Sequence, residues 1–269
     1  MSEQPAKKGA SQDTENEQNS LSAADAYHAR RGVYLIPNLL TTTALFAGFY
    51  AIVAAIKGDF NNAAVAIFVA MIFDGLDGRV ARLTHTQSEF GAQYDSMSDL
   101  VAFGVAPALV ALLWSLDSLG NLGWAGAFVY VAGAALRLAR FNTQISTTDK
   151  RFFVGLASPA AAAIVAGSVW AFTELGIEGT DLAVVMVILV PAVGCLMVSN
   201  VRYWSFKEVG VKGRIPFTAL LLIIMAFVVV ALDPPIVLLL VAFAYAGSGP
   251  VMEVWRKFKR RSATPDGDL

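Results

Sequence analysis

The sequence predicts an all-α integral membrane protein with about eight transmembrane helices. The composition is 56% hydrophobic and only 15% charged over 269 residues, whereas a soluble domain carries about a quarter charged residues. Apolar runs of about twenty residues, the length of a transmembrane helix, recur between residues 33 and 255. Positive charge is confined to alternate loops between these runs.

The order of polar and apolar segments predicts the elements. Residues 1–29 are rich in Ser, Gln, Glu, Asp and Ala, and we expect a disordered cytosolic tail. A basic cytosolic tail at 256–269 ends the chain. Between the tails, the apolar runs predict helices at 33–56, 61–82, 95–115, 121–141, 155–175, 182–201, 215–232 and 235–255.

The distribution of Lys and Arg predicts the orientation. With these eight spans, every Lys and Arg except Lys57 falls on one side of the membrane. Loops that carry an excess of positive charge lie in the cytosol. We therefore expect both termini to be cytosolic in a multi-pass protein of a bacterial inner membrane.

One polar stretch, from Asp74 to Asp99, interrupts the apolar region. Its aspartates form two pairs, Asp74 with Asp77 and Asp95 with Asp99, and each spacing places a pair on one helix face. Four carboxylates brought together repel unless they share protons or bind cations. Oxygen ligands suit Mg²⁺ or Mn²⁺ better than zinc. The stretch therefore predicts a divalent-metal site, on the cytosolic side of the membrane.

Other residues of this stretch suit a phosphate ligand. Gly78 and Gly91 leave room for a ligand close to the backbone, and Arg82 carries a planar charge of the kind that binds phosphate. A transporter with intramembrane aspartates as cation sites is an alternative from another class. It is disfavoured because the aspartates lie towards one surface and no inverted repeat is evident.

With its spacing, the stretch reads D-x2-D-G-x2-A-R-x8-G-x3-D-x3-D. It resembles the signature of the CDP-alcohol phosphotransferase family at every position: Asp74, Asp77, Gly78, Ala81, Arg82, Gly91, Asp95 and Asp99. The resemblance implies a six-helix catalytic core at 30–207 with two additional helices at 208–255. It also implies two divalent ions, with Asp74, Asp77 and Asp95 as ligands. Asp99 would lie at the second ion and accept the proton of the attacking hydroxyl.

The resemblance further implies a site for a CDP-linked lipid. From the signature and its spacer, the candidates are Gly78, Ala81, Arg82, Ser88 and Gly91. The segment Pro37-Asn38-Leu39-Leu40-Thr41 is similar to the family's Pro-Asn-x-x-Thr element and adds Asn38 and Thr41. The alternatives are helix packing for Ala81, membrane anchoring for Arg82 and helix capping for Asn38.

Three downstream segments point to the acceptor. Residues 136–142, 153–161 and 198–207 resemble the branch of the family that transfers a phosphatidyl group from CDP-diacylglycerol to L-serine, although Ala157 replaces a proline common there. We expect these two substrates, a lipid environment and no nucleic acid, and the sequence leaves room for a homodimer. Glycerol phosphate is the alternative acceptor.

A serine carboxylate needs a fixed cation. Arg137 and Arg140 are three residues apart on one predicted helix face, and Ser158 opens the next span. All three are candidates for binding serine. The alternative for Arg140 is a membrane anchor on the cytosolic side.

Overall fold

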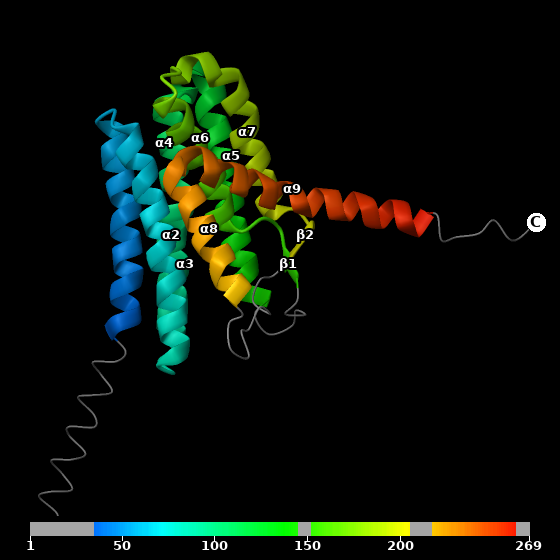
Figure 1. The fold of residues 1–269 in the computed structure, drawn as a ribbon. Coiled ribbons are helices and arrows are strands. Elements are labelled where there is room, and N and C mark those ends of the chain that lie inside the picture. The colour runs from blue at the N-terminus through cyan, green and yellow to red at the C-terminus, as the bar shows by residue number, and fades with distance from the viewer. Residues whose placement is uncertain (1–34, 145–151, 205–216, 262–269) are drawn as a thin grey trace, which may run out of the picture.

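The computed structural model describes residues 35–144, 152–204 and 217–261, and within these ranges the chain is almost entirely helical (Figure 1). The longer helices are the first helix Leu35–Ile56, α2 Phe60–Leu83, α3 Glu89–Asp99, α4 Ala106–Trp114, α5 Asn121–Gln144, α6 Ser158–Glu174, α7 Ala183–Val198, α8 Phe217–Leu232 and α9 Pro234–Arg261. The short elements are a π-helix η1 Leu100–Val105, 3₁₀ turns η2 Leu116–Leu119 and η3 Gly179–Leu182, and strands β1 Phe152–Val154 and β2 Arg202–Trp204. The two strands pair antiparallel. The N-terminal tail expected at 1–29 lies outside the described residues.

The helices confirm an all-α integral membrane protein. Five of those described are long and apolar enough to cross a membrane: Leu35–Ile56, Glu89–Trp114, Asn121–Thr143, Gly179–Val198 and Pro234–Glu253. The shorter α6 and α8 have 17 and 16 residues, and α2 ends in the polar stretch. Each of the eight expected spans therefore corresponds to a helix.

The main difference in helix bounds concerns the third span. It was expected from residue 95, but α3 begins at Glu89, because Ser88 caps it: the Ser88 hydroxyl accepts a hydrogen bond from Gly91 N at 3.0 Å. The last span also extends beyond its expected end at residue 255, since α9 continues to Arg261.

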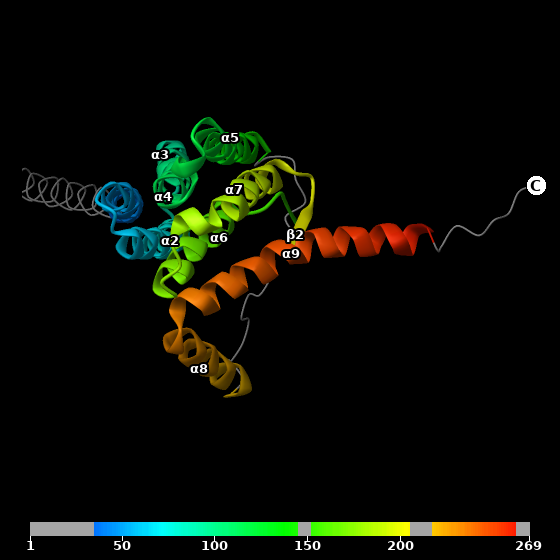
Figure 2. The ribbon, with the colours of Figure 1, turned by 90° about the horizontal axis from the view of Figure 1, so that it is seen from above.

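The helices from the first to α7 run along a common axis, whereas α9 crosses that axis (Figures 1 and 2). Seen from above in Figure 2, α9 lies along the outer side of α6, and α8 lies beyond it. The contacts agree, because α9 packs chiefly on α6 and also contacts β2 and α8.

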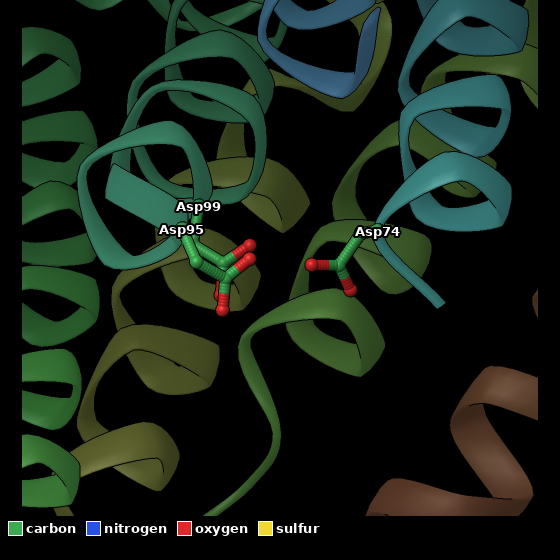
Figure 3. A group of neighbouring side chains, drawn as sticks. All are labelled: Asp74, Asp95 and Asp99. Atoms are coloured by element: carbon green, nitrogen blue, oxygen red, sulfur yellow. The ribbon is translucent and has the colours of Figure 1, made fainter. Parts of the chain in front are cut away.

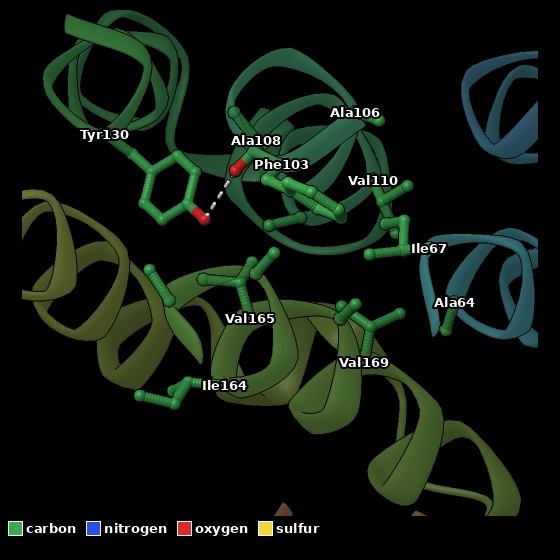
Figure 4. Close-up of a cluster of buried hydrophobic side chains, with 14 of the residues drawn as sticks. Ala64, Ile67, Phe103, Ala106, Ala108, Val110, Tyr130, Ile164, Val165 and Val169 are labelled. Atoms are coloured by element: carbon green, nitrogen blue, oxygen red, sulfur yellow. Dashed lines mark hydrogen bonds between the residues drawn. The ribbon is translucent and has the colours of Figure 1, made fainter. Parts of the chain in front are cut away.

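The core of the bundle is built from small side chains. Alanines on the first helix, α2, α4 and α6 are buried, with larger residues such as Ile67 and Phe103 between them (Figure 4). A close backbone approach joins α5 and α7: a Cβ added at Gly133 would lie 2.4 Å from the carbonyl oxygen of Gly194. Small residues permit such backbone contact between membrane helices. The position of α5, which carries both candidate arginines, is therefore closely constrained.

The π-helix η1 follows Asp99 directly and joins α3 to α4. Its wider turn is held by Tyr130 of α5, whose hydroxyl donates a hydrogen bond to the Phe103 carbonyl at 3.0 Å (Figure 4). Such π segments within longer helices often occur at functional sites. Here it separates the polar half of a membrane-length helix, with its aspartates, from the half that packs in the core.

Candidate functional site

A tight turn brings the two halves of the aspartate motif together. His85, between α2 and α3, has a φ of +53°, a left-handed conformation that few non-glycine residues adopt. The turn is closed by Thr86 N, which donates to the Ala81 carbonyl at 3.1 Å, and by a 2.8 Å hydrogen bond between the Thr84 and Thr86 hydroxyls. The chain therefore reverses within a few residues, and α3 returns alongside the end of α2.

Three aspartates face one another across this reversal. Asp95 and Asp99 lie side by side on α3, and Asp74 points towards them from α2 (Figure 3). One carboxylate oxygen from each lies within 4.8 Å of the others. All three side chains are partly buried. The structure thus brings Asp74 of α2 together with Asp95 and Asp99 of α3.

Asp77 lies beside this cluster and is held by the first helix. Its side chain is 5% exposed, and its Oδ2 accepts a 2.6 Å hydrogen bond from the Thr41 hydroxyl. The backbone at Thr41 is fixed in turn, because the buried Ser98 donates to its carbonyl at 3.1 Å. Asp77 also interacts electrostatically with Asp74, Asp95 and Asp99. Thr41 therefore connects the Pro-Asn-x-x-Thr element to the aspartates.

The donor set fits a hard divalent cation. The three oxygens lie within 4.8 Å of one another, compared with about 4 Å for oxygens on opposite sides of a bound Mg²⁺. Uncompensated, the same carboxylates would repel. Oxygen atoms alone form the cluster, as Mg²⁺ and Mn²⁺ prefer.

The two glycines of the motif each have polar side chains as neighbours. A Cβ added at Gly91 would lie 3.1 Å from the Ser88 hydroxyl and 3.6 Å from Asn38 Oδ1, so these three residues are neighbours. A Cβ at Gly78 would lie 3.4 Å from Arg82 Nη1, because Arg82 reaches back along α2. The Arg82 side chain is exposed and Ala81 is partly buried.

The structure gives the two candidate arginines different partners, although their spacing predicted one shared face. Arg137 Nη1 donates to the hydroxyl of the buried Ser158 at 2.8 Å, and its guanidinium interacts electrostatically with Asp99. Arg140 Nη2 instead donates to Asn200 Oδ1 at 2.9 Å. Arg137 thus connects α5 to the start of α6, and Arg140 connects α5 to the chain after α7.

One nitrogen of Arg137 lacks a hydrogen-bond partner among the described residues. Within the described parts of the chain, Arg137 Nε is buried and has no hydrogen-bond partner. A buried donor without a partner costs about 1–3 kcal/mol. Its position beside Asp99 and Ser158 suits an anionic group of a substrate.

Two further polar contacts at the site were not singled out from the sequence. Asn142 Nδ2 donates to the Ser96 hydroxyl at 3.0 Å and so holds α5 against α3 between the two α3 aspartates. Tyr94 and Thr42 share a 2.9 Å hydrogen bond, and Tyr94 stacks on Phe90. Asn142 is the last residue of the 136–142 segment, and the family resemblance of that segment was the only signal in the sequence that could have indicated its role.

These features are those of a membrane enzyme that acts on a CDP-linked lipid, and the chain belongs to the CDP-alcohol phosphatidyltransferase family. The model of that family matches residues 34–195, more than half of the chain. The matched region includes the whole aspartate motif, the Pro-Asn-x-x-Thr element, Arg137 and Ser158.

Relatives narrow the comparison to one branch. A Helicobacter pylori protein named CDP-diacylglycerol–serine O-phosphatidyltransferase is 40% identical over 203 residues, which cover 74% of this chain and 83% of the relative. A protein of the same name from Mycobacterium bovis is 36% identical over 227 residues, covering 80% and 78%. A third, from Methanocaldococcus jannaschii, is 36% identical over 178 residues, covering 66% and 78%.

Removing one carboxylate of the cluster should weaken metal binding. We expect Asp95→Asn to reduce the affinity of the purified protein for Mn²⁺ on the order of 10-fold or more, since it removes a charged oxygen ligand. Isothermal titration with Mn²⁺ measures this. Asp117→Asn, on the exposed η2 turn, is the matched control and should bind as the unmodified protein does. Equal Mn²⁺ affinity of both variants would exclude the cluster as a metal site.

Proposed function

We propose that this protein transfers the phosphatidyl group of CDP-diacylglycerol to the hydroxyl of L-serine, giving phosphatidylserine and CMP. The observation that carries the proposal is the position of Arg137, beside Asp99 and with a buried Nε free of partners in the described residues. An amino-acid acceptor needs such a cation for its carboxylate. The names of the relatives favour serine over glycerol phosphate, and the family favours an enzyme over a cation-coupled transporter.

We propose that Asp74, Asp77, Asp95 and Asp99 hold two divalent cations, Mg²⁺ or Mn²⁺. The observations in support are the clustered oxygens of three of them and the electrostatic contact of Asp77 with the rest. Cations bound there would polarise the diphosphate and stabilise the charge that develops on CMP.

The side chains of the protein then have distinct tasks. Asp99 accepts the proton of the serine hydroxyl, whose oxygen attacks the phosphorus that bears diacylglycerol. As the new P–O bond forms, the bond from this phosphorus to the bridging oxygen breaks, and CMP leaves with its electron pair. Arg137 binds the serine carboxylate through Nε, and the Ser158 hydroxyl accepts a hydrogen bond from its Nη1. Alignment of the hydroxyl with phosphorus supplies much of the rate.

The nucleotide end of the CDP-linked lipid would bind beside the small residues of the aspartate motif. The residues proposed there are Asn38, Thr41, Gly78, Ala81, Arg82, Ser88 and Gly91. Arg82 is exposed and suited to a phosphate. For Thr41 and Ser88 the proposal is indirect, because the Thr41 hydroxyl donates to Asp77 and the Ser88 hydroxyl caps α3. Arg140 as a serine ligand stays a prediction.

We propose that the site faces the cytosol of a bacterial inner membrane, with both termini on the same side. The confinement of Lys and Arg to one side supports this. The division into a core at 30–207 and two added helices at 208–255 is consistent with the extent of the family match. A homodimer stays a prediction.

An acceptor panel tests the function directly. Purified protein is supplied with CDP-diacylglycerol, Mg²⁺ or Mn²⁺, and serine, glycerol 3-phosphate, inositol phosphate or choline. We expect CMP release and phosphatidylserine formation with serine alone, and loss of both when EDTA removes the metal. Asp99→Asn should lower turnover by about 10²-fold or more, since it removes the general base. Preferential use of another acceptor would refute the assignment of serine.

The role of Arg137 predicts a selective change in KM. Arg137→Lys keeps the charge but removes the planar fork, so it should raise the KM for serine by about 10- to 150-fold. The KM for CDP-diacylglycerol should change much less. Steady-state kinetics with each substrate varied in turn measures both. Equal increases would place Arg137 on the diphosphate instead.

The proposed orientation predicts which turns can be labelled from outside the cell. In a background with Cys195 changed to Ala, a cysteine at the exposed Gln87, between α2 and α3, should resist a membrane-impermeant maleimide in intact cells. A cysteine at the exposed Ser118 of η2 should react. Both should react after the membrane is permeabilised. Reaction of position 87 in intact cells would reverse the orientation.

A further inference from the structure

Helix α3 carries two serines between its aspartates, in the order Asp95-Ser96-Met97-Ser98-Asp99. Successive residues of an α-helix are about 100° apart around its axis. Asp95 and Asp99 therefore point in similar directions, and Ser96 and Ser98 lie about 80° to either side of the direction midway between them. Met97 lies on the opposite side of the helix. The two hydroxyls thus flank the face of α3 that carries the aspartates.

The side of α3 that faces away from the aspartates is exposed. Phe90, Gln93 and Met97 share this side, and all three are exposed. Helix α3 therefore lies at the surface of the bundle, where packing on one side alone constrains its rotation only weakly. Apolar burial also gives membrane helices little reason to associate. Polar contacts are therefore needed to set the direction in which the α3 aspartates point.

On one flank, α3 is held by the first helix. Ser98 is 2% exposed, and its hydroxyl donates to the Thr41 carbonyl at 3.1 Å. On the same flank, the hydroxyls of Tyr94 and Thr42 share a 2.9 Å hydrogen bond. The Thr41 hydroxyl in turn donates to Asp77 of α2. This flank is therefore connected through the first helix to the aspartates of α2.

On the other flank, α3 is held by a side chain of α5. The Ser96 hydroxyl accepts a hydrogen bond from Asn142 Nδ2 at 3.0 Å and donates one to the Ala92 carbonyl, within α3, at 3.0 Å. In the described parts of the chain, no other residue pair joins α3 to α5 by a hydrogen bond. Loss of the Ser96 contact would leave this flank free to turn, and the α3 aspartates would turn with it.

We propose that Ser96 and Ser98 are positioning residues, whose hydroxyls fix the rotation of α3 so that Asp95 and Asp99 face Asp74. Neither serine is a metal ligand in this assignment. They act through the aspartates, because Mg²⁺ demands a nearly ideal arrangement of its oxygen ligands. The inference rests on the proposed metal site and extends it to two residues outside the fixed positions of the motif.

Ser96→Ala tests the α5 flank, because it removes the hydroxyl and keeps a residue that favours the helix. We expect the affinity for Mn²⁺ to fall about 3- to 10-fold in isothermal titration, as for the loss of one hydrogen bond. The melting temperature of the metal-free protein in detergent should be unchanged. Ser168→Ala is the matched control, since the buried Ser168 donates to the Ile164 carbonyl of its own helix at 2.7 Å.

The first-helix flank predicts a smaller effect. Ser98→Ala should lower the Mn²⁺ affinity less than Ser96→Ala does, because the hydrogen bond between Tyr94 and Thr42 remains on that flank. The double variant should bind Mn²⁺ more weakly than either single variant, since neither flank keeps its serine contact. A double variant that binds as well as Ser96→Ala alone would refute the part assigned to Ser98.

Asn142→Ala shows whether Ser96 acts through α5. If it does, combining Asn142→Ala with Ser96→Ala should weaken Mn²⁺ binding little more than Ser96→Ala alone, because both changes remove the same contact. Multiplication of the two effects would overturn the proposal. An equal loss of affinity in Ser168→Ala would also overturn it, since any buried serine would then have the same effect.

Asp95→Asn distinguishes failure of this inference from failure of the metal site. If Asp95→Asn binds Mn²⁺ weakly while Ser96→Ala binds as the unmodified protein does, only the positioning role is refuted. If Asp95→Asn also binds as the unmodified protein does, the proposed metal site and this inference fail together.

Discussion

Carboxylates that face one another inside an apolar bundle stay charged only if positive charge lies among or beside them. Three aspartate oxygens within 4.8 Å of one another impose this constraint here. The surrounding structure meets this constraint in two ways. The carboxylate oxygens of the cluster suit divalent cations. Arg137 supplies a fixed positive charge beside Asp99. The left-handed turn at His85 joins α2 to α3. The hydrogen bond from Thr41 to Asp77 holds the first helix against α2.

Helix α5 combines packing with recognition. Gly133 brings its backbone against α7, and Tyr130 satisfies the carbonyl of the π-helix. Further along α5, Arg137 donates a hydrogen bond to Ser158, and Asn142 donates one to Ser96. The contacts that fix α5 in the bundle therefore also fix the distance between Arg137 and the aspartates. In a membrane, where apolar burial gives helices little reason to associate, such close packing has to be built from small residues and polar contacts.

Much of this could be predicted from the sequence, because the signal was local. The spacing of Asp74, Asp77, Asp95 and Asp99 predicted two helical pairs, and the apolar runs predicted the fold class and each helix. The helix bounds were predicted less accurately where a capping residue decides them, as Ser88 does for the start of α3. The different partners of Arg137 and Arg140 could not be predicted, since three-residue spacing places both near one face. Which partner each meets depends on α6 and on the chain after α7.

The π-helix after Asp99 has a consequence for how the site could be lost. Each residue of an α-helix turns the chain by about 100°, and a π turn holds more residues than an α turn does. The same residues wound as α-helix between Leu100 and Val105 would rotate Asp95 and Asp99 by about 100° relative to α4. Such a chain would have the same hydropathy profile and the same aspartates. Its carboxylates, however, would no longer face Asp74. The direction in which the α3 aspartates point thus depends on the wide turn of an apolar segment that carries no functional group.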